Sequence, residues 1–234
     1  MTFPWTRHSG KVAYKKSGFV RKVANKIDEE APDLVLLTGD FILGRESNAL
    51  YLSPLKDIGQ KYPTFAVTGN HEFDLAFAGD LDYKDKTATL RKLFNQWEIS
   101  ILDNQTKKIT LGEGTINIAG VPDLWTNKAN LDVINNFIDP RYPKILLSHN
   151  PDIILDKESE NFDLILSGHT HNGQIRLPFI GNIPSMPTKL GRAFSAGLFK
   201  LKNGYLYITA GLGETGPRAR LFNRPELTVL KINL

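Results

Sequence analysis

The chain contains no cysteine among its 234 residues, which excludes disulfides and thiolate metal sites but leaves imidazole, carboxylate and amide sites open. It also lacks any apolar run approaching the roughly 20 residues of a membrane span, and its N-terminus lacks the apolar stretch of a signal peptide. No tract rich in proline, glycine or serine divides it, and no internal repeat is visible. These absences predict one soluble domain, long enough to bury a substantial core.

Acidic residues are absent from the first 26 positions, which carry seven lysines and arginines. Because the whole chain has a formal charge of +4, the remainder carries a net −3. A basic segment of this kind could attract an anionic lipid surface, a phosphorylated ligand or nucleic acid. A solvated helix face is the simpler interpretation, since charge runs are common and unspecific.

Helices and strands are expected to alternate in the first half of the chain. Ser17 is a suitable N-cap for a helix whose apolar face ends before Ala31-Pro32. The apolar runs 34–37 and 64–67 are typical of strands buried on both faces. Further helices are expected within 48–61 and 84–97. This alternation predicts a parallel sheet with crossover helices.

The second half of the sequence predicts a partly antiparallel region and further strands. A hairpin turn is expected at Gly112-Glu113-Gly114. One more helix is expected over 129–138, and the region after Gln174 is rich in loops. The expected strands cover 99–102, 107–111, 115–119, 144–147, 162–166, 205–209 and 227–232.

Four of the five histidines lie in three short turns, and each turn directly follows an apolar run. A fourth turn, Gly39-Asp40, ends a run of the same kind. Side chains that follow buried strands emerge at one edge of a sheet, so we expect them to converge. The three histidine turns are Gly69-Asn70-His71-Glu72, Ser148-His149-Asn150 and Gly168-His169-Thr170-His171.

Together these turns supply a carboxylate, an amide oxygen and up to four imidazoles. That set suits a borderline divalent metal such as Mn, Fe or Zn. Each turn alone is weak evidence for a metal site, because Gly-Asp and Gly-Asn pairs are common in tight turns and single histidines often cap helices or pack in the core. Their joint occurrence after strands predicts a metal site.

Taken in order, these motifs resemble the calcineurin-like metallophosphoesterases. The stretches 173–178 and 211–226 are similar to one bacterial branch of that family. This branch includes UDP-2,3-diacylglucosamine pyrophosphatases of lipid A synthesis and membrane-associated phosphodiesterases. The resemblance implies an α/β fold in which two mixed sheets pack as a sandwich flanked by helices. The implied domain covers residues 17–234, after an irregular segment 1–16.

The resemblance also implies roles for the ligand residues. Asp40 would be the carboxylate that bridges two metal ions. Asn70, His149 and His169 would complete the ligands of one ion, and His171 would serve the other. The implied cofactors are divalent ions, Mn, Fe or Zn, with two in the family and one or two expected here.

Other residues would act on the substrate. His71 corresponds to the family's histidine that is not a ligand and contacts the phosphoryl group or protonates the leaving oxygen. Arg218 and Arg220, in the glycine-rich loop 211–220, are candidates for binding substrate phosphate, with ordinary surface charge as the alternative. Glu72 and Asp74 are interpreted as loop or supporting groups rather than ligands.

The sequence departs from the family pattern at its start. The opening Asp-x-His motif, expected some thirty residues before Asp40, is missing, and Pro4 makes residues 2–7 a poor central strand. The first strand is therefore expected to be missing, and the ion of His171 would keep two ligands. His8 is a weak substitute. We expect a truncated product of a longer gene, with a one-metal enzyme or a silent relative as alternatives.

The expected function is metal-dependent hydrolysis of a phosphoester or pyrophosphate bond, with manganese as a candidate metal. A lipid-linked or nucleotide-linked substrate is favoured, and lipid A biosynthesis is a candidate setting. The alternatives are a catalytically silent phospholigand-binding protein and, less favoured, a nuclease, so nucleic acid is not expected as a partner. The expected location is the cytoplasm, with peripheral contact at the inner membrane left open.

Overall fold

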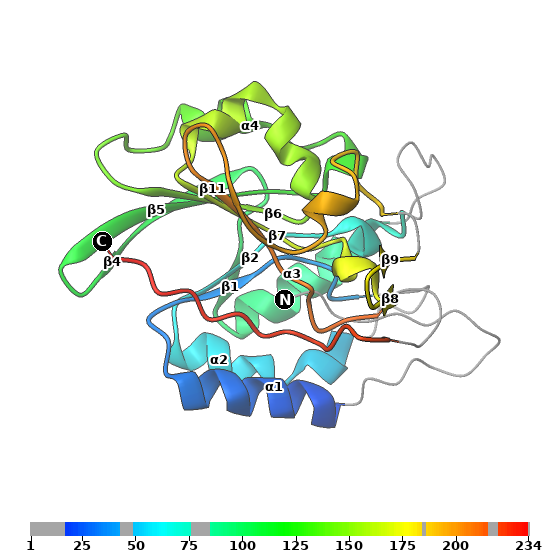
Figure 1. Ribbon diagram of the computed structural model, residues 1–234. Coiled ribbons are helices and arrows are strands. Elements are labelled where there is room, and N and C mark those ends of the chain that lie inside the picture. Colours follow the sequence, from blue (N-terminus) through cyan, green and yellow to red (C-terminus); the bar gives the residue numbers. More distant parts are fainter. Residues whose placement is uncertain (1–16, 43–48, 76–84, 184–185, 215–219, 234) are drawn as a thin grey trace.

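The structure is a computed structural model that describes residues 17–42, 49–75, 85–183, 186–214 and 220–233. Two β-sheets pack face to face, with helices α1, α2 and α3 under the smaller sheet and α4 (Leu131–Asn135) over the larger one (Figure 1). The predicted α/β sandwich flanked by helices is therefore confirmed. The segment 1–16, predicted to be irregular, and His8 within it lie outside the described residues.

The smaller sheet has the strand order β1-β2-β3 and is parallel throughout, rather than mixed as predicted. Each of its strands follows a helix, as the alternation predicted, because a parallel pair needs a crossover. Helix α1 buries the apolar face that its sequence spacing predicted. The elements are α1 (Ser17–Glu30), β1 (Val35–Leu37), α2 (Leu55–Lys61), β2 (Thr64–Ala66), α3 (Thr87–Gln96) and β3 (Ile99–Ile101).

The larger sheet is mixed and has the order β10-β11-β7-β6-β5-β4. Its two outer pairs, β4·β5 and β10·β11, are antiparallel, while the inner strands run parallel. The strands are β4 (Gln105–Leu111), β5 (Gly114–Val121), β6 (Lys144–Ser148), β7 (Leu164–Ser167), β10 (Gly197–Lys200) and β11 (Tyr205–Ile208).

Apolar side chains from both sheets fill the space between them. Phe65 and Val67 come from the end of β2, and they pack in one cluster with Ile118, Ile145 and Leu147 of the larger sheet. Burial of such side chains is the main favourable term in folding. Their packing also places the carboxyl ends of β1, β2, β6 and β7 at one edge of the sandwich, where the functional turns begin.

Several short elements complete the described chain. A small hairpin consists of β8 (Arg176–Leu177) and β9 (Gly181–Asn182). In the described part of the chain, no helix combines the length and the apolar character needed to cross a membrane. Helix α4 covers Leu131–Asn135, and the 3-10 helices are η1 (Ala49–Leu52), η2 (Asn70–Phe73), η3 (Leu124–Thr126), η4 (Pro151–Leu155), η5 (Lys157–Asn161), η6 (His171–Gly173) and η7 (Arg192–Phe194).

Three sequence expectations need correction. The helix expected over 129–138 is only α4, because Asn130 caps it and a turn follows Asn135. The described part of the region after Gln174 is rich in loops as expected, apart from the two-residue strands β8 and β9, but the sequence reasoning missed β10. The strand expected over 227–232 is wrong: this segment forms no ladder, and a cleft of about 720 Å³ lies between it and β1.

Candidate metal centre

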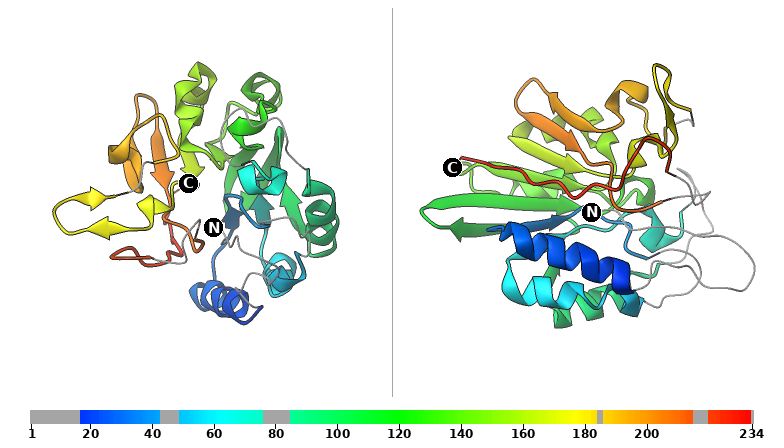
Figure 2. Two further views of the ribbon diagram at one scale, coloured as in Figure 1. Left: turned by 90° about the vertical axis from the view of Figure 1, so that its right-hand side faces the viewer. Right: turned by 60° about the horizontal axis from the view of Figure 1, so that its bottom comes forward.

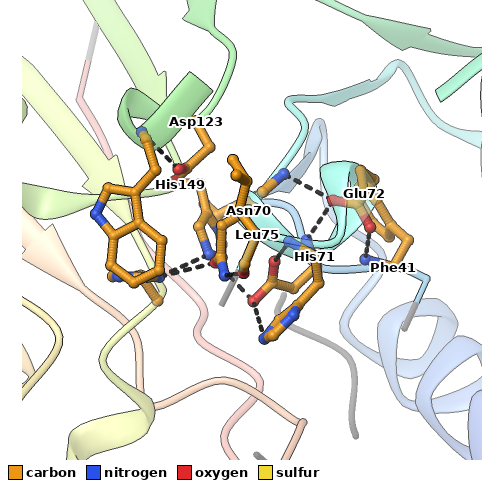
Figure 3. Close-up of polar contacts among 12 residues, drawn as sticks. Phe41, Asn70, His71, Glu72, Leu75, Asp123 and His149 are labelled. Carbon is orange, nitrogen blue, oxygen red and sulfur yellow. Dashed lines mark hydrogen bonds and ion pairs between the residues drawn. The ribbon is translucent and has the colours of Figure 1, made fainter. Parts of the chain in front are cut away.

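The predicted site residues meet at the carboxyl edge of the sandwich. Asp40 and Asn70 lie in the turns after β1 and β2, while His149 and His169 lie in the turns after β6 and β7. All four are almost completely buried. Figure 3 shows Asn70, His71 and His149 directed toward a common point. Residues from both sheets therefore contribute to one cluster.

The donor atoms of this cluster lie close together. Nε2 of His149 is 3.1 Å from Oδ2 of Asp40 and 3.1 Å from Nδ1 of His169. Nδ1 of His169 is also 3.1 Å from Oδ1 of Asn70. The ligand atoms of Asp40, His149 and His169 all lie within 4.8 Å of one another. One ion could therefore contact a carboxylate oxygen, an amide oxygen and two imidazole nitrogens.

Hydrogen bonds outside the cluster orient two of these donors. Nδ1 of His149 lies 2.6 Å from the carbonyl oxygen of Thr38, so an N–H there points away from the cluster and leaves Nε2 facing it. The amide nitrogen of Asn70 donates to the carbonyl oxygen of Leu75 at 2.8 Å, which turns Oδ1 inward. Metal-binding histidines in proteins are commonly held by such partners.

Backbone geometry also explains the glycine at position 39 and orients two of the donors. Gly39 has φ of +94°, and a side chain there would meet the backbone nitrogen of Gly69 and the ring of His149. Asp40 and His169 have φ of 60° and 66°, which is a left-handed conformation rarely adopted by residues other than glycine. Strained residues of this kind concentrate at functional sites, and here they aim the donor side chains inward.

Glu72 is buried beside the cluster, but its carboxylate binds backbone rather than the cluster. It accepts hydrogen bonds from the N–H groups of Gly69 (2.7 Å), Asp40 (2.9 Å), Phe41 (2.6 Å) and Ile42 (2.8 Å) (Figure 3). Burial and the nearby Asp40 carboxylate raise the pKa of Glu72, while these donors act in the opposite direction. Glu72 thus joins the turns after β1 and β2.

Asp40 and His149 form a buried charge pair. Burial alone would raise the pKa of Asp40, but His149 and the neighbouring His71 hold it well below its usual range. Burial alone would lower the pKa of His149, but Asp40 outweighs it and raises the pKa to about 9. Without a cation, a proton on His149 therefore balances the Asp40 carboxylate.

The pKa of His169 is shifted in the opposite direction to that of His149. Burial, reinforced by the charge of His149, holds the pKa of His169 well below its usual value. The ring is therefore neutral near pH 7 and has a lone pair to offer. Its Nε2 is buried and has no hydrogen-bond partner among the described residues.

His71 lies on the open side of the cluster. Its backbone N–H donates to Oδ1 of Asp40 at 3.1 Å, and its Nε2 lies 4.0 Å from Oδ2 of the same residue. Burial is the main cause that lowers the pKa of His71, and Asp40 opposes it. The side chain keeps 15% of its surface exposed, so the ring can meet a bound molecule at the cluster.

His171 is buried, and its Nδ1 has no partner among the described residues. Burial lowers the pKa of His171 to about 3, so the ring is neutral. The amide nitrogen of Asn223 donates to the backbone oxygen of His171 at 2.7 Å and holds this turn. Within the described ranges, only Asp40, His149 and His169 form a group of three such ligand side chains, and His171 stands outside it.

Of the two arginines predicted to bind substrate phosphate, the structure describes one. Arg218 lies outside the described residues. Arg220 lies near His171 and donates from Nε to the carbonyl oxygen of Gly213 (2.8 Å) and from Nη2 to that of Ala210 (2.9 Å). Its Nη1 is buried and has no partner in the described chain. This arginine shapes its own loop and keeps one donor for a ligand oxygen.

Sequence reasoning missed Asp123 and Trp125, which follow β5 at the same edge. Asp123 is buried, accepts from the N–H of Trp125 at 2.9 Å, and has Oδ2 without a partner in the described part of the chain. Burial raises the pKa of Asp123 to about 6. The Trp125 ring meets His169 edge-on, with centroids 4.8 Å apart. The same signal, a polar residue directly after an apolar run, could have found Asp123.

The residues present fit a divalent metal ion. Carboxylate, amide and imidazole donors converge, and two imidazole nitrogens approach to 3.1 Å around that point. Such a donor set suits Mn, Fe or Zn, and it contains no thiolate. Buried polar atoms normally have partners, so Nδ1 of His171, which has none among the described residues, is also consistent with a site built for something besides protein.

An α/β sandwich with a buried cluster of carboxylate, amide and imidazole donors at its carboxyl edge defines a metal-site hydrolase architecture. Residues 15–173 match the calcineurin-like phosphoesterase family. The match covers more than half of the chain, so the protein belongs to that family. The resemblance predicted from the turns is therefore confirmed.

Curated relatives agree with this assignment. The chain is 32% identical over 208 residues to the uncharacterized metallophosphoesterase YkoQ of Bacillus subtilis, covering 87% of this chain and 74% of YkoQ. It is 31% identical to the phosphodiesterase YaeI of Escherichia coli, covering 87% of this chain and 72% of YaeI. It is 26% identical to the UDP-2,3-diacylglucosamine pyrophosphatase LpxG of Chlamydia muridarum, covering 91% of this chain and 78% of LpxG.

Proposed function

We propose that this protein hydrolyses a phosphoester or pyrophosphate bond in a metal-dependent reaction. The observation that carries the proposal is the convergence of Asp40, Asn70, His149 and His169 donor atoms at one buried point open beside His71. A divalent ion held there would supply charge that polarises a phosphoryl oxygen and acidifies a water molecule. Hydrolysis of a phosphate ester needs both effects, because negative charge must be neutralised during attack.

In this proposal the chain's own residues orient the substrate and donate hydrogen bonds to it. His71 donates an N–H to a phosphoryl oxygen or to the leaving oxygen, from a position fixed by its backbone bond to Asp40. Nη1 of Arg220 supplies a further donor near His171. Glu72 and Thr38 keep the turns rigid, so the donors are placed before a substrate arrives.

The substrate class proposed is a phosphorylated small molecule, with a lipid-linked or nucleotide-linked diphosphate favoured. Support comes from LpxG, whose name states that it cleaves UDP-2,3-diacylglucosamine, and from YaeI, which is named a phosphodiesterase. Manganese is the metal we propose to try first. A role in lipid A synthesis would follow if the lipid-linked substrate is correct.

A silent phospholigand-binding protein is the second candidate, and one observation favours it. His171 is the only predicted ligand for a second ion besides Asp40, and the described chain brings no third ligand side chain to it. Catalytic metal sites usually have three or more protein ligands. The cluster of Asp40, Asn70, His149 and His169 would then hold one ion without turnover.

The test is hydrolysis of bis-p-nitrophenyl phosphate after reconstitution with Mn. Asp40→Asn and His169→Ala should both abolish turnover, while Asp132→Asn, an exposed carboxylate on α4, should leave it unchanged. Metal content is measured on the same samples. Bound Mn without any turnover would select the silent protein, and turnover that survives both site variants would refute the proposal.

A further inference from the structure

The β8–β9 hairpin carries large apolar side chains that the fold does not bury. Phe179 and Ile180, at its turn, have exposed fractions of 110% and 67%. Ile183, at its base, and Leu221 and Phe222, in the adjoining segment, are also exposed. These five residues are called the apolar tip. Figure 2 shows the hairpin projecting away from the body of the sandwich.

Backbone contacts hold the base of the hairpin beside the segment that carries Leu221 and Phe222. Ile175 bridges Leu221 on one side, and its backbone oxygen accepts from the N–H of Ile183 at 3.1 Å on the other. The N–H of Arg176 donates to the oxygen of Leu221 at 3.0 Å. Neighbouring extended segments lie about 5 Å apart. Leu221 and Ile183 therefore lie on opposite sides of Ile175 at the base of the hairpin.

Two phenylalanines in the tip are both exposed and strained. Phe179 has φ of 66° and Phe222 has φ of 51°, the left-handed region that glycine and asparagine occupy most easily. Bulky residues there gain no compensating burial in this fold. Strain kept without a packing benefit points to a role outside the folded core.

The part of the sequence that contains the apolar tip is rich in basic residues. Between Asp163 and Glu226 the sequence contains a single acidic residue, Glu214, against eight lysines and arginines. Arg224, two residues after Phe222, is exposed, as are Lys189 and Arg192 later in the chain than the hairpin. Apolar side chains with basic neighbours are the combination that binds the interface of an anionic bilayer.

The hairpin is tied to the turn that carries His171. Nη1 of Arg176, at the start of β8, donates to Oδ1 of Asn172 at 2.5 Å and also contacts Oδ1 of Asn182 in β9. Asn172 is the residue after His171. A surface that engaged the apolar tip would therefore lie at a fixed position relative to the donor cluster.

We propose that the apolar tip docks the protein on an anionic lipid bilayer. Phe179, Ile180 and Phe222 insert at the boundary between headgroups and acyl chains, while Arg224, Lys189 and Arg192 meet the lipid charge. A projecting apolar tip can insert into a deformable lipid surface, whereas a folded protein partner would need a complementary pocket. The following step rests on the proposed function: docking in this geometry would present the metal centre to a phosphoryl group at the membrane surface.

The test is co-sedimentation of the full chain with vesicles, in the presence of a chelator so that hydrolysis plays no part. Wild type should bind vesicles containing phosphatidylglycerol, more weakly at high salt, and should bind phosphatidylcholine vesicles poorly. The double variant Phe179→Asn/Phe222→Asn should bind about tenfold or more weakly, because two large apolar side chains no longer insert.

Asparagine tolerates the left-handed backbone, so the double variant should unfold at the same temperature as wild type or higher. Phe137→Asn removes a phenylalanine that is 76% exposed outside the tip and should bind vesicles like wild type. Wild type that fails to bind anionic vesicles, or a double variant that binds equally well, would overturn the proposal. A wild-type dimer that the double variant abolishes, without vesicle binding, would assign the tip to self-association instead.

Turnover of bis-p-nitrophenyl phosphate separates this proposal from the proposed function. The double variant should hydrolyse this soluble substrate at the wild-type rate. If the wild type binds vesicles but shows no turnover, the proposed hydrolase function is refuted and the docking proposal stands.

Discussion

Gly69 lies directly against the carboxylate of Asp40: a Cβ atom at position 69 would come within 2.2 Å of Oδ1. No rotation of the carboxylate avoids this contact while Oδ1 accepts from His71 and Oδ2 faces His149. Gly69→Ala should therefore weaken Mn binding about tenfold or more, as changes around metal ligands commonly do. Isothermal titration calorimetry measures the affinity.

A matched control is Gly18→Ala in α1, where a Cβ atom meets nothing within 4 Å. This variant should bind Mn like wild type and gain about 0.5 to 1 kcal/mol of stability from helix propensity. Equal Mn affinities in wild type and Gly69→Ala would contradict the close approach.

Glu72→Gln should destabilise the fold although it barely changes the size of the side chain. One end of the new amide is a donor and would face backbone N–H groups that the carboxylate now satisfies. Leaving buried donors unpaired should cost about 2 to 4 kcal/mol, measured by urea unfolding. Glu113→Gln, in the exposed turn between β4 and β5, should change stability by less than about 0.5 kcal/mol.

Metal affinity should rise with pH because an ion must displace the proton on His149. The pKa of His149 is raised to about 9 by Asp40, whereas the pKa values of Asp40 and His169 are lowered, so neither of these two binds a proton near pH 7. One proton is then released per ion, and Mn affinity should increase about tenfold per pH unit from pH 6 to 9 before levelling off. Calorimetry in buffers of different ionisation enthalpy counts the protons, and a flat affinity over this range would contradict the Asp40–His149 pair.

Asn223→Ala should loosen the turn that carries His171. The lost bond, from the Asn223 amide to the His171 oxygen, is buried, so its removal should cost about 1 to 3 kcal/mol. If His171 binds an ion, the Mn concentration for half-maximal turnover should rise while turnover at saturating Mn stays near wild type. Asn203→Ala, an exposed amide near Glu160, is the control and should leave the Mn dependence unchanged.

Local sequence patterns were enough to predict that the turns converge at one edge, whereas the assignment of particular ligands came from the family resemblance. Each apolar run, such as 34–37 before Gly39-Asp40, contains a strand and delivers its next residues to the end of that strand, although Leu36 of β1 stays only partly buried. With several parallel strands, those ends meet at one edge. Asp40, Asn70, His149 and His169 therefore converge without any knowledge of the loops between them.

Features that depend on distant backbone were not predictable. The role of Glu72 becomes clear only in the structure, where backbone N–H groups of two turns donate to its carboxylate. Strands β8 and β9 are two residues each, too short to show any alternation. Residues 227–232 have the composition of a strand but lie across a cleft from β1 instead of pairing with it. Composition gave no indication of that separation.

The donor cluster draws on both sheets, and this has a kinetic consequence. Nδ1 of His169 and Oδ1 of Asn70 belong to residues 99 positions apart, so they meet only after the two sheets have docked. A folding intermediate with a single formed sheet has half a binding site and gains nothing from the ion. Refolding should begin at the same rate with or without Mn, and the ion should act mainly by slowing the reverse reaction, as expected for an interaction absent from the transition state.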